Sequence, residues 1–342
     1  MLADVVDCLR CPHCADDAIG LTLSERTLRC PNGHTFDLAK QGYVSLLTGH
    51  AAAVPGDTAA MVAAREAFLS GGHFSPITSA LTTAAAAAAA GLTPGDALSP
   101  GGGLPSGGGP PPRGRVGPGG GLLPGGRGGE VGSGGELPPA GGGVVPGTGG
   151  DAAGRCVLDL GAGTGHYLAA VLDAVPGWVG VAADISGYAL RRAARAHARA
   201  GAVRCDAWRP LPLRSGAVDV VVNVFAPRNG AELNRVLNSG GVVLVVAPTG
   251  RHLRELAAAV GAVSVDPRKA DRLDAALGPY FTRSGSEVVE TTLRLSHAEA
   301  VTAVAMGPAA WHVDPETLTA RVAALPEPVE VTLSVTLSTY RR

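Results

Sequence analysis

Residues 157–167 read VLDLGAGTGHY, and this stretch decides the fold of the chain. A short apolar run ends in a glycine-rich turn, and an Ala/Leu-rich segment follows it. This order predicts a strand, a turn and a helix, which together open a nucleotide-binding α/β unit. Glycines let the backbone pass close to a ligand, and the helix N-terminus offers free N–H groups to it. We therefore expect a ligand at this turn.

The glycine spacing indicates which cofactor the turn holds. Gly161, Gly163 and Gly165 form G-x-G-x-G, and Asp159 stands two residues before the first of them. His166 occupies the position where a dinucleotide site has glycine, which disfavours a hydride-transfer enzyme. The shorter spacing suits S-adenosylmethionine (SAM).

Two further acidic residues extend this prediction along the chain. Asp184 follows a predicted strand at 179–183 and lies 23 residues after Gly161, where a carboxylate accepts both ribose hydroxyls. Asp206 lies near the end of the next predicted strand, 203–207, and is the candidate for binding the adenine amino group.

Strands and helices alternate after the glycine turn, which predicts a parallel, doubly wound sheet. Further strands are expected at 218–225 and 242–247. Two long alternating segments, 288–295 and 329–339, enclose a helix at 298–305 and would close the sheet as an antiparallel hairpin. This order resembles a class I SAM-dependent methyltransferase, a Rossmann-like α/β fold with a mostly parallel seven-stranded sheet.

A predicted helix at 187–200 carries a basic face of Arg191, Arg192, Arg195 and Arg199. Two interpretations stay open. Most such faces are simply solvated, and the alternative is contact with phosphate.

Cysteines near the N-terminus follow the pattern of a zinc site. Cys11 and Cys14 belong to one tight turn, and Cys30 and His34 to a second, and each turn begins Cys-Pro. Two such turns facing each other give a closed tetrahedral Cys₃His set, as expected for structural zinc. Cys8 leaves an alternative pair open, because Cys8-x₂-Cys11 also has zinc spacing. We prefer Cys11 with Cys14, which mirrors the second turn.

Composition divides the chain into four parts. We expect a zinc-binding ribbon at 1–47, a helical bridge at 48–93, a Gly/Pro-rich insert at 94–152 and the methyltransferase domain at 153–342. The insert has no periodicity and almost no aromatic or β-branched residues, so it cannot bury enough surface to offset its ordering entropy. It is therefore expected to be disordered.

Charge and cysteine usage exclude several classes of protein. The formal net charge of −1 gives no general attraction to nucleic acid or to a membrane. No stretch of about 20 apolar residues is present, so no membrane span is expected. Four of the six cysteines lie within the first 30 residues, which does not indicate a disulfide scaffold in a chain this long. A cytoplasmic protein is expected.

Motifs for the methyl acceptor are informative through their absence. Residues 223–227 read NVFAP where exocyclic-amine methyltransferases have Asn/Asp-Pro-Pro-Tyr, and no Pro-Cys pair offers a cysteine nucleophile. Covalent catalysis is therefore disfavoured. Direct transfer to a nitrogen or an oxygen remains, with positioning supplying most of the rate.

A collinear series of motifs carries a closer resemblance. The two cysteine turns are followed by FDLAKQGYVSLL (36–47), GDT (56–58), GGHF (71–74), the glycine turn, FAPRN (225–229), GRHL (250–253) and MGPAAW (306–311). In this order the chain resembles the bacterial 23S rRNA guanine-N1 methyltransferases that modify the hairpin loop of helix 35. That group includes macrolide-resistance enzymes of actinomycete antibiotic producers. The likeness covers nearly the whole chain except the insert.

The resemblance implies a role for the matching residues. Those that would bind zinc are Cys11, Cys14, Cys30 and His34. Those that would bind or line SAM are Gly161, Gly163, Thr164, Gly165 and Asp184, with Phe74 and His252 as further positions. The ribbon would help to hold 23S rRNA, the FAPRN form indicates nucleotide 748 in place of 745, and a homodimer is implied.

The acceptor chemistry sets further expectations. Guanine N1 carries a proton at neutral pH, so the enzyme must accept this proton or stabilise the base as it leaves, and must splay the base out of its loop. Asn223, Arg228 and Asn229 are the candidates for gripping the guanine edge. His252 and Asp206 are the available titratable groups, and the general base stays unassigned.

Two other functions remain open. One is a small-molecule methyltransferase that carries a zinc ribbon, and the other is a non-catalytic zinc-ribbon RNA-binding protein. The ribbon counts against the first, since small-molecule enzymes rarely need a separate module to hold substrate. The intact glycines and Asp184 count against the second.

Overall fold

The computed structural model describes residues 2–49, 56–92, 154–261 and 269–342. The chain divides into two compact units, and all described residues belong to the unit formed by Met1–Leu98 and Ala153–Arg342. The expected insert at 94–152 lies outside the described residues. Within the described part, no helix is long and apolar enough to cross a membrane.

An eight-stranded sheet forms the centre of this unit, in the order β10-β11-β9-β8-β5-β6-β7-β4. Its strands are β4 (Tyr43–Ser45), β5 (Cys156–Leu160), β6 (Val179–Asp184), β7 (Ala200–Arg204), β8 (Val218–Val224), β9 (Leu237–Pro248), β10 (Thr282–Leu295) and β11 (Val329–Arg341). The strands from β4 to β9 pair in parallel, and β11 pairs antiparallel with β9 and β10. The mostly parallel sheet and its antiparallel hairpin are therefore as predicted.

One strand joins this sheet from an unexpected part of the chain. β4 lies within 36–47, the segment that leads out of the predicted ribbon, and its Tyr43 pairs with Ala202 of β7. It adds an eighth strand to the seven expected. β7 itself begins and ends three residues earlier than predicted, so Asp206 lies in the turn after the strand. The ends of an individual β-strand are set by the strands with which it pairs, and local sequence does not reveal these partners.

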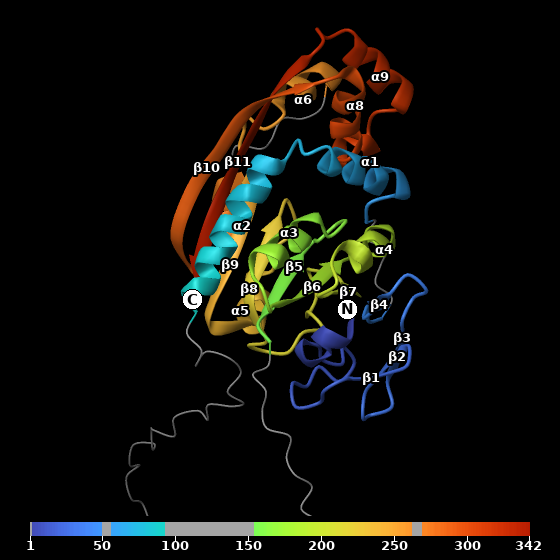
Figure 1. The fold of residues 1–342 in the computed structure, drawn as a ribbon, viewed down its shortest axis with the longest axis vertical. Helices are drawn as coiled ribbons and strands as arrows, with labels where there is room; N and C mark the ends of the chain where they lie inside the picture. Colours follow the sequence, from blue (N-terminus) through green and yellow to red (C-terminus); the bar gives the residue numbers. More distant parts are fainter. Residues whose placement is uncertain (1, 50–55, 93–153, 262–268) are drawn as a thin grey trace, which may run out of the picture. The chain divides into compact units, whose positions relative to one another are not determined.

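Both faces of the sheet are covered, which explains why every residue of β5 and β8 is buried. One face packs against α2 (Ser75–Ala90), α3 (His166–Ala174), α4 (Gly187–Ala196), α6 (Arg254–Val260) and α8 (His297–Ala305), and α9 (Pro315–Ala323) packs on α6 and α8 (Figure 1). The other face packs against the 3₁₀ helix η1 (Leu2–Cys8), the ribbon, α5 (Gly230–Val236) and α7 (Lys269–Leu277). The N-terminal segment is therefore part of the apolar core of the sheet.

A small antiparallel sheet forms the ribbon, with β1 (Thr22–Ser24), β2 (Thr27–Arg29) and β3 (Thr35–Asp37) in that order. The third strand, β3, contains the residues that follow the second cysteine turn. Only Leu28 and Phe36 are buried within these three strands, so the ribbon has little apolar core of its own.

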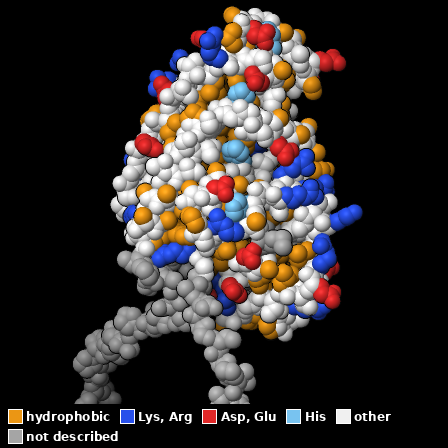
Figure 2. Space-filling view, viewed as in Figure 1, with side chains coloured by type: hydrophobic (Ala, Val, Ile, Leu, Met, Phe, Trp, Pro, Cys, Tyr) orange, Lys and Arg blue, Asp and Glu red, His pale blue; other side chains and the backbone are white. Residues whose placement is uncertain are grey.

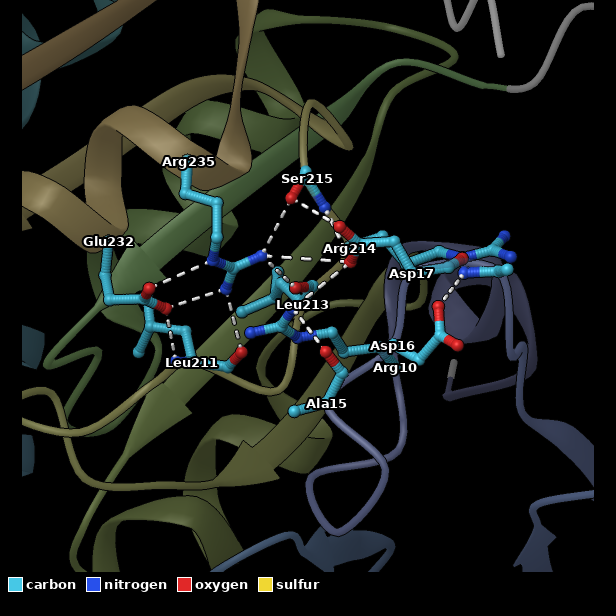
Figure 3. A network of polar contacts seen from close by, with 11 residues as sticks. Arg10, Ala15, Asp16, Asp17, Leu211, Leu213, Arg214, Ser215, Glu232 and Arg235 are labelled. Carbon is cyan, nitrogen blue, oxygen red and sulfur yellow. Dashed lines mark hydrogen bonds and ion pairs between the residues drawn. The ribbon is translucent and has the colours of Figure 1, made fainter. Parts of the chain in front are cut away.

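Polar contacts fasten the ribbon to the loop before β8 and to α5 (Figure 3). The carboxylate of Asp17 accepts from the backbone N–H and the hydroxyl of Ser215, at 3.2 and 2.5 Å, and contacts the guanidinium of Arg10 at 3.3 Å. Arg235 of α5 donates to both carboxylate oxygens of Glu232, at 3.0 and 2.7 Å, and lies 4.0 Å from Asp17. The ribbon is thus tied to the helix that follows residues 225–229.

Candidate active site and zinc centre

The glycine turn between β5 and α3 has the shape that only glycine permits. Gly161, Gly163 and Gly165 have φ values of 80°, 55° and 81°. A Cβ atom at Gly161 would lie 2.3 Å from Cβ of Ala226, and one at Gly165 would lie 3.0 Å from Cα of Ala193. The turn is therefore pressed between the loop after β8 and helix α4, and any side chain at these glycines would force them apart.

Asp184 lies at the end of β6 beside this turn. One carboxylate oxygen accepts from the backbone N–H of Gly163 at 2.8 Å, and the other from Ser186 at 2.7 Å. Burial raises the pKa of Asp184, the two backbone hydrogen bonds oppose this, and the neighbouring Asp57 carboxylate adds to it. Asp184, the residue predicted to bind ribose, is thus linked to the glycine turn by a direct hydrogen bond.

Asp159 lies beneath the turn with an unsatisfied oxygen. Its side chain is buried, and its Oδ2 has no hydrogen-bond partner among the described residues; the hydroxyl of Tyr167 is in the same situation. Burial raises the pKa of Asp159 to about 8, and the charge of Asp184 contributes. A buried acid, Asp159, and a half-buried one, Asp184, lie beside a turn that excludes side chains, and a bound cation would stabilise the ionised form of both. The residues present therefore fit SAM, which carries a sulfonium and an ammonium group.

Arg65 of α1 (Ala59–Ser70) approaches the turn from the other side. Its guanidinium pairs with Asp57, donates to the carbonyl of Met306 at 2.8 Å, and would lie 3.5 Å from a Cβ atom at Gly163. The carbonyl of Asp57 also accepts from the hydroxyl of Ser186 at 2.8 Å. Sequence reasoning did not single out Arg65, because its backbone partner is 241 residues away.

Three aromatic rings from distant segments meet near the turn. Phe74 comes from the joint between α1 and α2, Phe225 from the loop after β8, and His252 from the loop after β9. The ring centroids of Phe225 and His252 are 5.4 Å apart, and those of Phe74 lie 6.3 and 5.7 Å from them. Phe74 is buried, whereas Phe225 is 38% exposed and has a φ of 54°, which is unusual for a bulky residue.

The orientation of His252 follows from a backbone contact. Its Nδ1 accepts from the N–H of Ser334 in β11 at 3.3 Å. A neutral imidazole whose Nδ1 is an acceptor carries its proton on Nε2. The predicted cofactor-lining residues Phe74 and His252 are therefore brought together. Phe225 joins them without having been given a role from the sequence.

The three residues predicted to grip guanine make hydrogen bonds within the loop after β8 and at the start of α5. Asn223 is fully buried, and its amide donates to the carbonyls of Leu160 and Pro227 at 3.1 and 3.0 Å. Its oxygen accepts from Nε of Arg228 at 2.9 Å. Asn229 is the N-cap of α5. These bonds hold the loop in position, and a role of Asn223, Arg228 and Asn229 in gripping guanine stays a prediction.

Asp206 lies in the turn after β7. Its carboxylate accepts from the N–H of Trp208 at 2.9 Å and lies 3.6 Å from Nε of Arg209. The structure thus places it within a tight turn of its own. A role in binding adenine stays a prediction.

The four predicted metal ligands converge in the ribbon. The ligand atoms of Cys11, Cys14, Cys30 and His34 all lie within 4.8 Å of one another. Nδ1 of His34 lies 3.6 and 3.4 Å from the sulfur atoms of Cys11 and Cys14. A tetrahedral zinc ion with Zn–S bonds of about 2.3 Å separates its ligands by roughly 3.7 Å, which matches. All four positions are filled by protein, so this is a structural zinc site.

The neighbours of the cluster settle the alternative pairing. Asn32 donates from Nδ2 to the sulfur of Cys14 at 3.3 Å, as expected beside a thiolate. Cys8 is not part of the cluster, and its thiol instead contacts Cys156 of β5 and, together with burial, raises the pKa of that thiol. The preferred pair, Cys11 with Cys14, therefore lies at the metal site.

Comparison with known proteins agrees with both sites. Residues 9–51 match the family model of the N-terminal zinc ribbon of RlmA, and residues 157–241 match a methyltransferase domain. A protein of Micromonospora griseorubida described as a 23S rRNA (guanine-N(1)-)-methyltransferase is 47% identical, over 100% of this chain and 99% of its own length. The 23S rRNA (guanine(748)-N(1))-methyltransferase of Streptomyces fradiae is 42% identical, over 100% and 99%.

Among solved structures, a protein of Bacillus halodurans described as a methyltransferase superposes with a TM-score of 0.40 and 17% identity, over 55% of this chain and 92% of its own. The sheet order, the glycine turn with Asp184, and the Cys₃His cluster define a class I SAM-dependent methyltransferase with a structural zinc ribbon. Full-length identities of 42 and 47% specify the family further. The chain belongs to the 23S rRNA (guanine-N1)-methyltransferases.

Proposed function

We propose that this enzyme transfers the methyl group of SAM to N1 of guanine 748, in the hairpin loop of helix 35 of 23S rRNA. The observation that carries this proposal is the 42% identity, across the whole chain, with the Streptomyces fradiae enzyme that is named for that nucleotide. The FAPRN motif at 225–229, in the loop that carries Phe225, supports the same choice of nucleotide.

SAM supplies an electrophilic methyl group on a cationic sulfur. The protein contributes position and electrostatics. When SAM binds, the glycine turn would admit it closely, Asp184 would hold the ribose, and Asp159 with Asp184 would favour the cation over the neutral product. Holding two reactants in line in this way supplies most of the rate in a direct transfer.

The exposed ring of Phe225 is the platform for the target base. A guanine splayed out of its loop needs an aromatic surface to replace its lost stacking. Phe225 is fixed by Asn223 and Arg228 through the loop contacts, and its ring neighbours His252. The loop bonds of Asn223, Arg228 and Asn229 thus act on the base indirectly, by holding Phe225 in its strained conformation.

His252 stabilises the base as its N1 proton passes to solvent water. Loss of that proton places negative charge on guanine O6. Because Nδ1 accepts from Ser334, Nε2–H is the donor that can stabilise this oxygen. A His252→Ala variant should lose about 10²-fold or more in kcat, while its Kd for SAM stays within a few-fold. If SAM binding is lost in parallel with kcat, His252 lines the cofactor only.

The main experiment uses tritiated SAM and 23S rRNA from a strain that lacks the modification. We expect label in the RNA, and a primer-extension stop at guanine 748. A stop at 745 would correct the nucleotide, and RNA without label would overturn the proposal. Label in a small molecule from a cell extract, with none in RNA, would establish the small-molecule alternative.

Resistance can be tested separately. Expression of the chain in a macrolide-sensitive host without the modification should raise the inhibitory macrolide concentration. The control is the Gly161→Ala variant, which retains the ribbon. Equal resistance with both proteins would exclude methylation as its cause.

A further inference from the structure

Helix α4 presents basic side chains that neither the cofactor nor the zinc centre uses. Arg191, Arg192 and Arg195 are exposed, and α4 contains no acidic residue. Arg192 pairs with Glu66 of α1 at 2.7 Å. Arg191 and Arg195 are one turn apart on the same face, roughly 6 Å along the axis. Figure 2 shows Lys and Arg side chains gathered over α4.

The position of one of these arginines is held in advance. The guanidinium of Arg191 lies 5.1 Å from the ring centroid of Tyr188, which is itself 47% exposed. A cation–π contact of this kind orients the guanidinium without neutralising its charge. An exposed aromatic ring beside an oriented arginine is typical of surfaces that bind nucleic-acid backbones.

This surface starts at the cofactor site. Ser186, the N-cap of α4, donates its backbone N–H to Asp184. The helix therefore leads away from the ribose-binding acid along the outside of the sheet.

The surface continues to the zinc ribbon. The turn that contains Lys40 packs on α4, because a Cβ atom at Gly42 would lie 3.7 Å from Cβ of Ala194. The same turn is bound by Arg26, which donates to the carbonyl of Ala39 at 2.8 Å. Arg26 belongs to the turn between β1 and β2, and both it and Lys40 are exposed.

We propose that Arg191 and Arg195 of α4, Lys40 and Arg26 form a basic strip that binds the phosphate backbone of the RNA stem next to the target loop. This inference rests on the proposed function, because an RNA hairpin is the occupant. A chain of net charge −1 has no general attraction to RNA, so a strip of this kind supplies the attraction locally. Of the acids near the strip, Glu66 pairs with Arg192, Asp37 accepts from the hydroxyl of Thr27, and Glu25 is exposed beside Arg26.

The experiment measures binding of a fluorescent hairpin RNA by the full, zinc-loaded chain at several salt concentrations. In the Arg191→Gln/Arg195→Gln variant, the slope of log K against log salt should decrease in magnitude by about 1.8. This value corresponds to two phosphate contacts at about 0.9 each. At moderate salt its affinity should fall roughly 10-fold. Zinc content and Kd for SAM should equal those of the wild type.

The matched control is Arg283→Gln/Arg294→Gln on β10, at the opposite edge of the sheet. This control also removes two positive charges, and it should leave the slope of log K against log salt unchanged. Equal slopes for the wild type and the α4 variant would contradict the proposed basic strip. Equal losses of RNA affinity in the α4 variant and the control would also contradict it.

The two proposals can fail separately. If the wild type methylates rRNA but the α4 variant keeps the wild-type slope, only the strip is wrong. If the slope flattens as expected but the wild type does not methylate rRNA, only the proposed function is wrong. A wild type that binds no RNA would overturn both.

Discussion

Two regions are stabilised by different forces: the zinc ribbon, and the end of the sheet that carries the glycine turn and Asp184, which we call the cofactor edge. The ribbon buries only two side chains in its three strands and depends on four ligands around one ion. The cofactor edge rests on strands that are buried throughout, and its turn is shaped by close packing against Ala226 and Ala193. One region should therefore respond to loss of metal, and the other to small changes in shape or charge.

Removing a zinc ligand should produce the largest effect, centred on the ribbon and on the face of the sheet that the ribbon covers. In Cys30→Ser, zinc should fall from one equivalent to near zero, since structural zinc contributes about 10–16 kcal/mol to such modules. Metal analysis and hydrogen exchange of residues 11–37 measure this. Cys8→Ser is the control, because Cys8 contacts Cys156 and not the cluster. A Cys30→Ser protein that keeps its zinc would contradict the ligand set.

Adding one methyl group to the turn should weaken cofactor binding strongly while the ribbon keeps its zinc. In Gly161→Ala the new Cβ would lie 2.3 Å from Ala226, and φ is 80°. We expect Kd for SAM, measured by calorimetry, to rise about 100-fold or more, a loss of about 3 kcal/mol. Gly177→Ala has the same φ with open space around it, so it should bind SAM normally. Equal binding losses in both would show that strain, and not contact, decides.

The buried charge at Asp159 should make the free protein less stable as the pH rises. Its folded pKa of about 8 exceeds the unfolded value, so stability is fully present below about pH 4 and is lost as the pH rises to about 8. Asp159→Asn removes this titration. Between pH 6 and 9 the free energy of unfolding of the variant, relative to that of the wild type, should rise by at most about 1.4 kcal/mol per pH unit. The difference should level off above pH 8. A pH-independent difference in denaturant unfolding would contradict this, and saturating SAM should reduce the slope.

The smallest effect is expected at the junction between the two regions. Asp17→Ala removes the hydrogen bonds to Ser215 and the contact with Arg10, and should cost about 1–2 kcal/mol. The melting temperature should fall by about 2 °C. Asp37→Ala, within the ribbon sheet, removes the same charge without touching the junction. Faster hydrogen exchange of α5 in Asp17→Ala alone would show that Asp17 couples the ribbon to α5. Identical exchange in both variants would exclude this coupling.

Features that depend on neighbouring residues could be read from the sequence. The glycine spacing, Asp184 and the order of strands predicted the cofactor edge, and the two Cys-Pro turns predicted the ligand cluster. The roles of residues in the loop after β8 could not be read in this way. Asn223 and Phe225 are two residues apart, yet one is fully buried and the other partly exposed, because Phe225 has a positive φ that its sequence does not signal.

By itself, therefore, the sequence determined the fold class, the metal ligands and the cofactor turn, because each is encoded by short spacings and local periodicity. Tertiary structure alone decided that Phe74, Phe225 and His252 meet, that Cys8 contacts Cys156, and that α4 packs against the turn that contains Lys40. These contacts join segments far apart in the chain. Only the packing of the sheet and its covering helices brings such segments together.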